Sequence, residues 1–96
     1  MALTFEWNAE KAAENLRKHG VSFEEAASSL GDPMSLTAPD PDHSVTEDRF
    51  VHLAVSYRNR PVTTIFVERE GRIRIISARP ASRHEREQYE QRLSPE

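Results

Sequence analysis

The C-terminal half of the chain carries three strand-forming segments that are separated only by short turns. The first, residues 49–57, alternates apolar and polar side chains. Residues 62–69 are β-branched or aromatic on both faces, as in a central strand, and residues 72–79 form the third segment. The connections, residues 58–61 and 70–71, are too short for the crossover that parallel neighbours need. The sequence therefore predicts an antiparallel three-stranded meander.

Helices are predicted before and after this meander, over residues 9–19, 23–30 and 83–93. Each follows a residue type that caps a helix N-terminus well, namely Asn8, Ser22 and Ser82. Both serines have a glutamate three residues later, which completes a capping box. The side chains of the first helix that are expected to face the core are Ala9, Ala12, Ala13 and Leu16.

Short strands over residues 3–7 and 34–38 would extend the sheet. The result is an α+β fold, a small antiparallel sheet packed with two N-terminal helices and a C-terminal helix. We expect one domain, residues 1–96, with one modest core. The absence of cysteine excludes disulfides and thiolate metal sites. No apolar run is long enough for a membrane span and no signal peptide is recognisable, so a cytoplasmic protein without a membrane partner is expected.

The formal net charge of −3 is unevenly distributed along the chain. Residues 21–48 contain seven acidic residues and no lysine or arginine, whereas residues 49–96 contain ten arginines and six glutamates. Arginine presents a planar fork of donors that suits phosphate or carboxylate groups. The bias therefore has two interpretations, recognition of phosphate or pairing of arginines with neighbouring glutamates on solvated faces.

Arg74 and Arg79 lie in the segment RIRIISAR, which must also supply isoleucines to the core. Strict alternation would place Arg79 on the same face as Ile73 and Ile75. Arg74 would then lie on the opposite face. Arginines on a rigid strand are held in position, as the stabilisation of a phosphate transition state requires. The alternative is structural, with Arg74 paired to a cross-strand acid and Arg79 capping a nearby helix.

Two histidine-containing groups could take part in proton transfer. His43 and Glu47 lie close together in DHSVTEDR, where the carboxylate could tune the histidine or act as a base itself. The alternative for this pair is an exposed loop with solvated charges. Lys18 and His19 end the first helix, where both also suit the negative end of the helix dipole. No histidine pair has the spacing of a metal site and no cofactor-binding motif occurs, so neither a metal nor a cofactor is expected.

Three blocks of the sequence, FEWNAEKAAENLRKHGVSFEEA, DHSVTEDRF and RIRIISARPASRHEREQY, together resemble the BrnT family of type II toxins. The resemblance runs in order from Phe5 to Tyr89, and KHGVSFEEA with RIISAR is its most specific part. It implies a RelE-like fold and a ribonuclease that arrests translation. It also implies a cognate BrnA-type antitoxin, a ribbon-helix-helix DNA-binding protein that binds the toxin in a hetero-oligomer. DNA would be contacted only through the antitoxin, and the RNA could be bound on the ribosome.

Carried over to this chain, the polar residues of the family are Lys11, Lys18, His19, His43, Glu47, Arg49, Arg74 and Arg79. The resemblance implies metal-independent cleavage, in which a 2′-hydroxyl attacks the adjacent phosphate and the strand arginines stabilise the developing charge. Glu47 or His19 would act as the base, and His43 or His19 as the acid. RNA binding would fall to the other cations, Lys11, Lys18, Arg49, Arg72 and Arg83.

The chain departs from the family pattern in ways that bear on activity. Pro80 stands where a basic residue usually follows ISAR, and Phe66 with Val67 replaces a tyrosine–threonine pair. If that tyrosine takes part in stacking or protonation, cleavage by this protein would be weak. The alternative function is a non-catalytic protein-binding module, or an inactive toxin that acts only as partner and co-repressor of the antitoxin.

Overall fold

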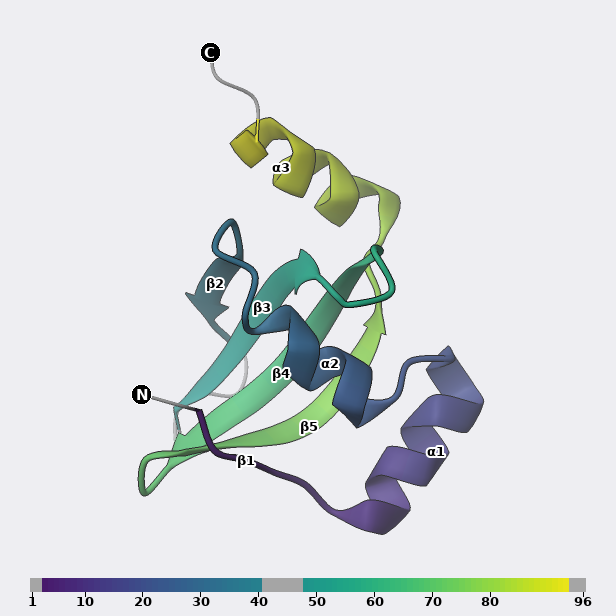
Figure 1. The fold of residues 1–96 in the computed structure, drawn as a ribbon, viewed down its shortest axis with the longest axis vertical. Coiled ribbons are helices and arrows are strands. Elements are labelled where there is room, and N and C mark those ends of the chain that lie inside the picture. Colours follow the sequence, from purple (N-terminus) through teal and green to yellow (C-terminus); the bar gives the residue numbers. More distant parts are fainter. Residues whose placement is uncertain (1–2, 41–47, 94–96) are drawn as a thin grey trace.

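The computed structural model describes residues 3–40 and 48–93 of the chain. Within these residues, five strands form one sheet in the order β1-β5-β4-β3-β2, accompanied by three helices (Figure 1). In chain order the elements are β1 (Phe5–Glu6), α1 (Ala9–His19), α2 (Phe23–Ser29), β2 (Leu36–Pro39), β3 (Arg49–Val55), β4 (Pro61–Arg69), β5 (Arg72–Pro80) and α3 (Arg83–Leu93). The predicted α+β class, the meander and the three helices are confirmed.

The sheet differs from the prediction in one respect, because it is mixed and not wholly antiparallel. The pairs β2–β3, β3–β4 and β4–β5 are antiparallel. β1 instead pairs parallel with β5 through Phe5 and Glu6. A parallel pair needs a long connection between its strands, and the rest of the fold supplies one between β1 and β5.

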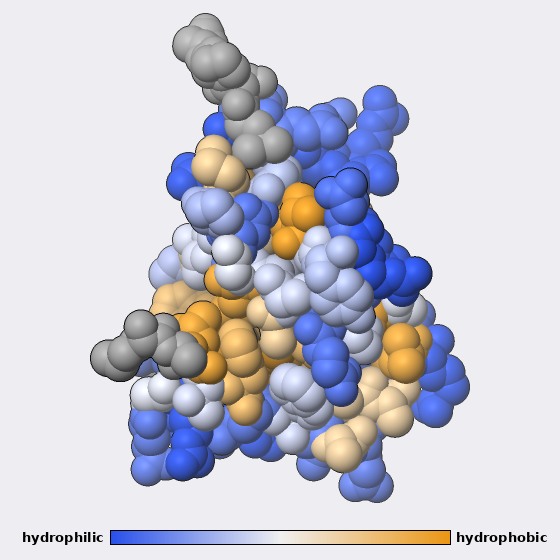
Figure 2. All heavy atoms as spheres, in the orientation of Figure 1, coloured by the Kyte–Doolittle hydropathy of each residue, from blue (hydrophilic) through white to orange (hydrophobic). Residues whose placement is uncertain are grey.

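The helices occupy different sides of the sheet (Figure 1). α2 crosses one face, α1 lies beside β5, and α3 stands at the end of the sheet. The main core lies between this face and the α1–α2 segment and consists of Val21, Phe23, Ala26, Val62, Phe66, Ile73, Ile75 and Ala78. A smaller cluster, Leu53, Ala81 and Tyr89, attaches α3. The surface over α3 is otherwise predominantly hydrophilic (Figure 2).

A bulge in β5 decides which of its side chains share a face. Ile65 and Phe66 are consecutive in β4, but their partners in β5, Ser77 and Ile75, are not. Ile76 is therefore an extra residue of β5. One extra residue reverses the alternation of side chains beyond it.

Because of the bulge, the apolar and the charged side chains of β5 lie on opposite faces of the sheet. The apolar residues that face the helices are Ile73, Ile75 and Ala78. The opposite face, here called the open face, carries Arg72, Arg74 and Arg79 with the cross-strand residues Val51, Leu53, Thr63 and Val67. The prediction that Arg79 shares a face with Ile73 and Ile75 is wrong, because strict alternation took no account of the bulge.

Asn15 joins α1 to the edge of β5. β1 is only two residues long and leaves the later part of this edge without a strand partner. There the Asn15 side chain accepts a hydrogen bond from the Ala78 N–H (3.2 Å) and donates to the carbonyl oxygen of Ala78 (2.8 Å). It also donates to the Val21 carbonyl (2.9 Å). This contact sets the inner face of α1, so the prediction that Ala9, Ala13 and Leu16 face the core is wrong: all three are exposed, and the Leu16 side chain is 50% exposed.

We expect Asn15→Leu to lower the free energy of unfolding by about 2–4 kcal/mol, because leucine fills the space but leaves buried backbone groups without partners. Urea unfolding followed by circular dichroism measures the effect. Arg17→Leu, on the exposed side of the same helix, is the matched control and should change stability by about 0.5 kcal/mol or less. Equal losses in the two variants would mean that the Asn15 amide does not support the edge of β5.

Candidate functional site

The strand arginines of the open face each lie beside a carboxylate. Arg74 Nη1 is 3.2 Å from Glu6 Oε2, and Arg72 Nη1 is 3.5 Å from Glu6 Oε1. Glu6 is directly opposite Arg74 in the parallel β1–β5 pair. The structural alternative for Arg74, pairing with a cross-strand acid, is therefore observed.

Arg79 makes a stronger, two-pronged contact with Glu85 in the first turn of α3. Its two terminal nitrogens donate to Glu85 Oε1 (2.7 Å) and Oε2 (2.9 Å). Glu85 also accepts from the Thr63 hydroxyl (2.9 Å) and from the Ser82 N–H (2.8 Å), which confirms the predicted capping box. The Arg79 guanidinium lowers the pKa of Glu85 to about 2, and Glu85 raises the pKa of Arg79. Both groups therefore stay charged across the physiological range.

This arrangement positions Arg79 without using all of its donors. Glu85 takes one hydrogen from each terminal nitrogen, and Nη1 also donates to the Pro80 carbonyl oxygen (3.4 Å). The Nε–H makes no hydrogen bond within the described residues. The Arg79 side chain is 43% exposed. A guanidinium has two edges that can each hold a pair of oxygens. One edge of Arg79 is fixed by Glu85, and the edge that includes Nε can bind a phosphate bidentately.

A groove between α1 and β5 gathers three further residues of the predicted site. Lys11, Lys18 and His19 line a hollow of about 250 Å³, with Ile76 and Ser77 of the β5 bulge on its other side. All three basic side chains are exposed. They lie within one helical turn of Asn15, the buried residue of α1. Because Asn15 binds the backbone of β5, the three basic side chains lie at the edge of that strand. Sequence predicted these residues as candidates, and the structure places them together.

Other predicted residues lie further apart. Arg74 and Arg79 are separated by roughly 16 Å along an extended strand, so one phosphate cannot engage both strand positions directly. Arg49 begins β3, and its cross-strand neighbour Val67 is in turn paired with Arg74. Arg49 therefore belongs to the Arg74 end of the open face.

The remaining predictions fall on α3 and on residues that are not described. Arg83 begins α3, its side chain is 86% exposed, and its Nε is 3.5 Å from Glu87. It projects from a different element and does not join the groove of Lys11. His43 and Glu47 lie outside the described residues, so their proposed acid–base roles stay predictions.

Within residues 3–40 and 48–93, no group of three or more histidine, aspartate or glutamate side chains is placed to hold a metal ion. No helix in the same segments is both long and apolar enough to cross a membrane.

One histidine that the sequence did not single out is buried in the fold. His52 is 4% exposed, and its Nδ1 lies 2.7 Å from the Thr37 hydroxyl. Its Nε2 lies 3.3 Å from the Ser29 carbonyl, and its ring meets Phe66 edge-on. Burial lowers the pKa of His52, although the Ser29 carbonyl and the charge of Asp32 act in the opposite direction.

His52 is expected to make stability fall as the pH drops below about 6.5, the ordinary pKa of histidine. In this range the unfolded chain binds a proton that the folded protein resists, so the free energy of unfolding decreases with pH. The slope for one proton is at most about 1.4 kcal/mol per pH unit, and it ends once the pH passes the lowered pKa of the folded state. Urea midpoints between pH 7.5 and 5 should fall for the wild type and stay flatter for His52→Gln. If the urea midpoints of the wild type and of His52→Gln change in parallel with pH, His52 is excluded as the titrating group.

Comparisons with known proteins agree with this fold. A profile of the family described as "Ribonuclease toxin, BrnT, of type II toxin-antitoxin system" matches residues 7–85. The fold is similar to the 1.1 Å crystal structure of the Brucella abortus ribonuclease toxin BrnT, with a TM-score of 0.66 and 21% identity over 85% of this chain and 100% of that one. No curated protein matches the chain. Because the family profile spans most of the sequence, the chain belongs to the BrnT family of ribonuclease toxins of type II toxin–antitoxin systems.

Proposed function

We propose that this protein is a metal-independent endoribonuclease that cuts RNA, mRNA included, and thereby inhibits translation. The observation that carries the proposal is the Arg79–Glu85 pair, in which a carboxylate with several hydrogen bonds fixes one edge of an exposed guanidinium. Its other edge is able to bind a phosphate. Membership of a ribonuclease toxin family supplies the class of reaction.

The proposed reaction is an internal transesterification of RNA. A base removes the proton of a 2′-hydroxyl, the oxygen attacks the neighbouring phosphorus, and an acid protonates the leaving 5′-oxygen. Arg79 stabilises the charge that develops on the phosphoryl oxygens, and Arg74 assists at a second phosphate. His19 is proposed as acid or base because its groove reaches Ser77, two residues from Arg79. Glu47 as base and His43 as acid are the alternatives.

RNA binding is assigned to five other basic residues. They are Lys11, Lys18, Arg49, Arg72 and Arg83. A chain with a net charge of −3 attracts RNA only weakly over long distances. We therefore propose that the ribosome presents the RNA to this protein, which makes cleavage of free RNA slow.

We also propose that the protein is cytoplasmic and forms one domain, and that its partner is a cognate BrnA-type antitoxin with a ribbon-helix-helix DNA-binding domain. The type II class to which the family belongs pairs a toxin with an antitoxin. The antitoxin would neutralise the nuclease in a hetero-oligomer and would make the only contact with DNA.

Expression of the chain alone in a bacterial host tests the proposal. Growth should stop and RNA should fragment, and co-expression of the antitoxin should relieve both. RNA cut by the purified protein in the presence of EDTA should carry 2′,3′-cyclic phosphate and 5′-hydroxyl ends. A folded, abundant protein that leaves RNA intact in cells would overturn the proposal.

The second candidate function is a non-catalytic partner of the antitoxin. It is favoured by the engagement of all three arginines on β5 with carboxylates, which are Glu6 and Glu85. In that case the RNA stays intact, while the protein still binds the antitoxin and strengthens repression of their operon.

A further inference from the structure

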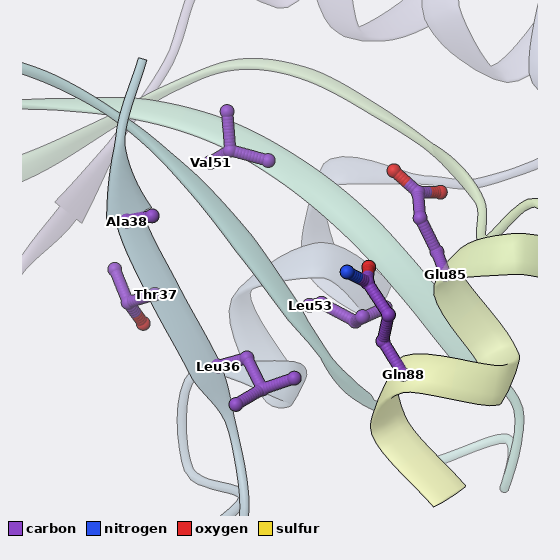
Figure 3. A pocket seen from close by; sticks show the side chains of 7 residues that line it. All are labelled: Leu36, Thr37, Ala38, Val51, Leu53, Glu85 and Gln88. Carbon is purple, nitrogen blue, oxygen red and sulfur yellow. The ribbon is translucent and has the colours of Figure 1, made fainter. Parts of the chain in front are cut away.

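The open face contains a hollow of about 300 Å³ between β2 and α3 (Figure 3). Its lining residues are Leu36, Thr37, Ala38, Val51, Leu53, Glu85 and Gln88. Leu53 lies between the two elements, and the Gln88 side chain extends toward it from α3 (Figure 3). The floor is formed by aliphatic side chains of neighbouring strands, since Leu36 and Leu53 are directly paired across β2 and β3.

The hollow adjoins the proposed phosphate site through one shared residue, Glu85. Glu85 lines the hollow and also holds Arg79, with nitrogen–oxygen distances of 2.7 and 2.9 Å. Leu53 on the floor is paired with Thr63, which is paired with Arg79. A phosphate on the outer edge of Arg79 is therefore within one nucleotide of the hollow. A ribose joins each phosphate to a base, so the neighbouring base has this hollow within reach.

The polar groups of the hollow favour one kind of base. Gln88 is exposed, and its amide makes no hydrogen bond within the part of the chain that the structure describes. A glutamine amide can form two hydrogen bonds with adenine, at its amino group and N7. Glu85 Oε2 accepts one hydrogen bond, from Arg79, and has capacity for another. Both side chains thus favour a base that carries an exocyclic amino group.

We propose that this hollow binds a nucleobase of the RNA substrate next to the phosphate on Arg79, with adenine preferred and Gln88 as the residue that recognises it. The aliphatic floor covers the face of the base, and the amide contacts its edge. The inference rests on the proposed function, because it assumes that the phosphate on Arg79 belongs to RNA. An apolar side chain of the antitoxin is the competing occupant, and it lacks the amino group that Glu85 and Gln88 favour.

Methyl NMR of the wild-type protein tests the proposal without requiring cleavage. Adenosine 5′-monophosphate should shift the methyl signals of Leu36, Val51 and Leu53, and uridine 5′-monophosphate should do so only at several-fold higher concentration. Ribose 5-phosphate, which has no base, should leave these signals unchanged. Equal responses to ribose 5-phosphate and to the adenine nucleotide would overturn the proposal.

Matched variants then locate the binding site. Ala38→Phe fills the hollow from an exposed position of β2 and should abolish the shifts, whereas Ala13→Phe on the exposed side of α1 should not. Gln88→Ala should remove the advantage of adenine over uracil, and Gln91→Ala, one turn further along α3, should keep it. If Ala38→Phe weakens binding of the antitoxin but leaves the nucleotide response intact, the hollow is a protein-docking site and the proposal is wrong.

Failure of this inference can be told apart from failure of the proposed function. RNA cleavage by the wild type with no methyl response to nucleotides removes the base site and leaves the nuclease. A methyl response that distinguishes adenine, in a protein that cuts no RNA in cells, supports the base site and removes the catalytic function.

Discussion

Replacing Arg79 with alanine is expected to lower the rate of RNA cleavage by on the order of 10²-fold or more. Arg79 offers an exposed, charged donor edge that is fixed on a strand, and the loss of one well-placed donor to a developing oxyanion has an effect of this size. Arg79→Lys keeps the charge but loses the two-pronged geometry, so it should remain strongly impaired. Cleavage of a labelled RNA, in cells or on ribosomes, gives the rates.

Two further variants separate catalysis from stability. Arg79→Ala leaves Glu85 without its main partner, and this loss alone could perturb α3. Arg79→Ala combined with Glu85→Gln removes the unpaired charge, keeps a side-chain oxygen for the Ser82 N–H and the Thr63 hydroxyl, and should restore stability but not cleavage. Arg17→Ala, which removes an exposed arginine from α1, should cut RNA at the wild-type rate. Recovery of cleavage in the double variant would mean that Arg79 only supports the fold.

Arg60→Ala is expected to lower the free energy of unfolding by about 3–5 kcal/mol, the largest stability effect predicted for this chain. The Glu25 side chain is 1% exposed, and Arg60 holds both of its oxygens at 2.7 Å. Arg60 also donates to the Gly20 carbonyl (2.8 Å), so it ties the β3–β4 turn to the start of α2. Thermal unfolding should shift down by more than about 10 °C.

The control and the pH dependence identify the cause of this loss. Arg58 lies in the same turn, 4.0 Å from Glu25, but is 60% exposed, so Arg58→Ala should have an effect of about 1 kcal/mol or less. The hydrogen bond from Arg60 is the main reason that the pKa of Glu25 is lowered. Without Arg60 the pKa of Glu25 moves upward, because burial is then opposed only by the Ser56 hydroxyl and by Arg58. The deficit should therefore shrink as the pH falls and Glu25 takes up a proton more readily in the variant than in the wild type. A deficit that is independent of pH would point to lost packing alone.

Glu25 takes part both in a local helix cap and in tertiary contacts with a distant hairpin. Its N–H is capped by the Ser22 hydroxyl at 2.9 Å, as the capping box predicts. Its carboxylate, however, binds Arg60 and the Ser56 hydroxyl (2.7 Å), which come from a hairpin more than 30 residues away. No local pattern contains that partner, because the pair forms only when the hairpin packs over α2.

By itself the sequence determined the local elements. The caps, the turn residues and the period of the apolar residues act over a few positions, and they placed the three helices and the meander correctly. The sequence also determined the family, since the matching blocks are distributed along the whole chain. It identified Lys11, Lys18 and His19 as candidates from their positions at one helix end and in one block.

Only the tertiary structure decided which of these side chains share a surface. The bulge at Ile76 reverses the alternation of β5 and moves Arg79 to the open face. The contact of Asn15 with Ala78 turns α1 so that its basic residues border the strand edge. The partner of Arg79, Glu85, comes from another element. These outcomes depend on register and packing between segments far apart in the chain, which residue periodicity within one segment does not contain.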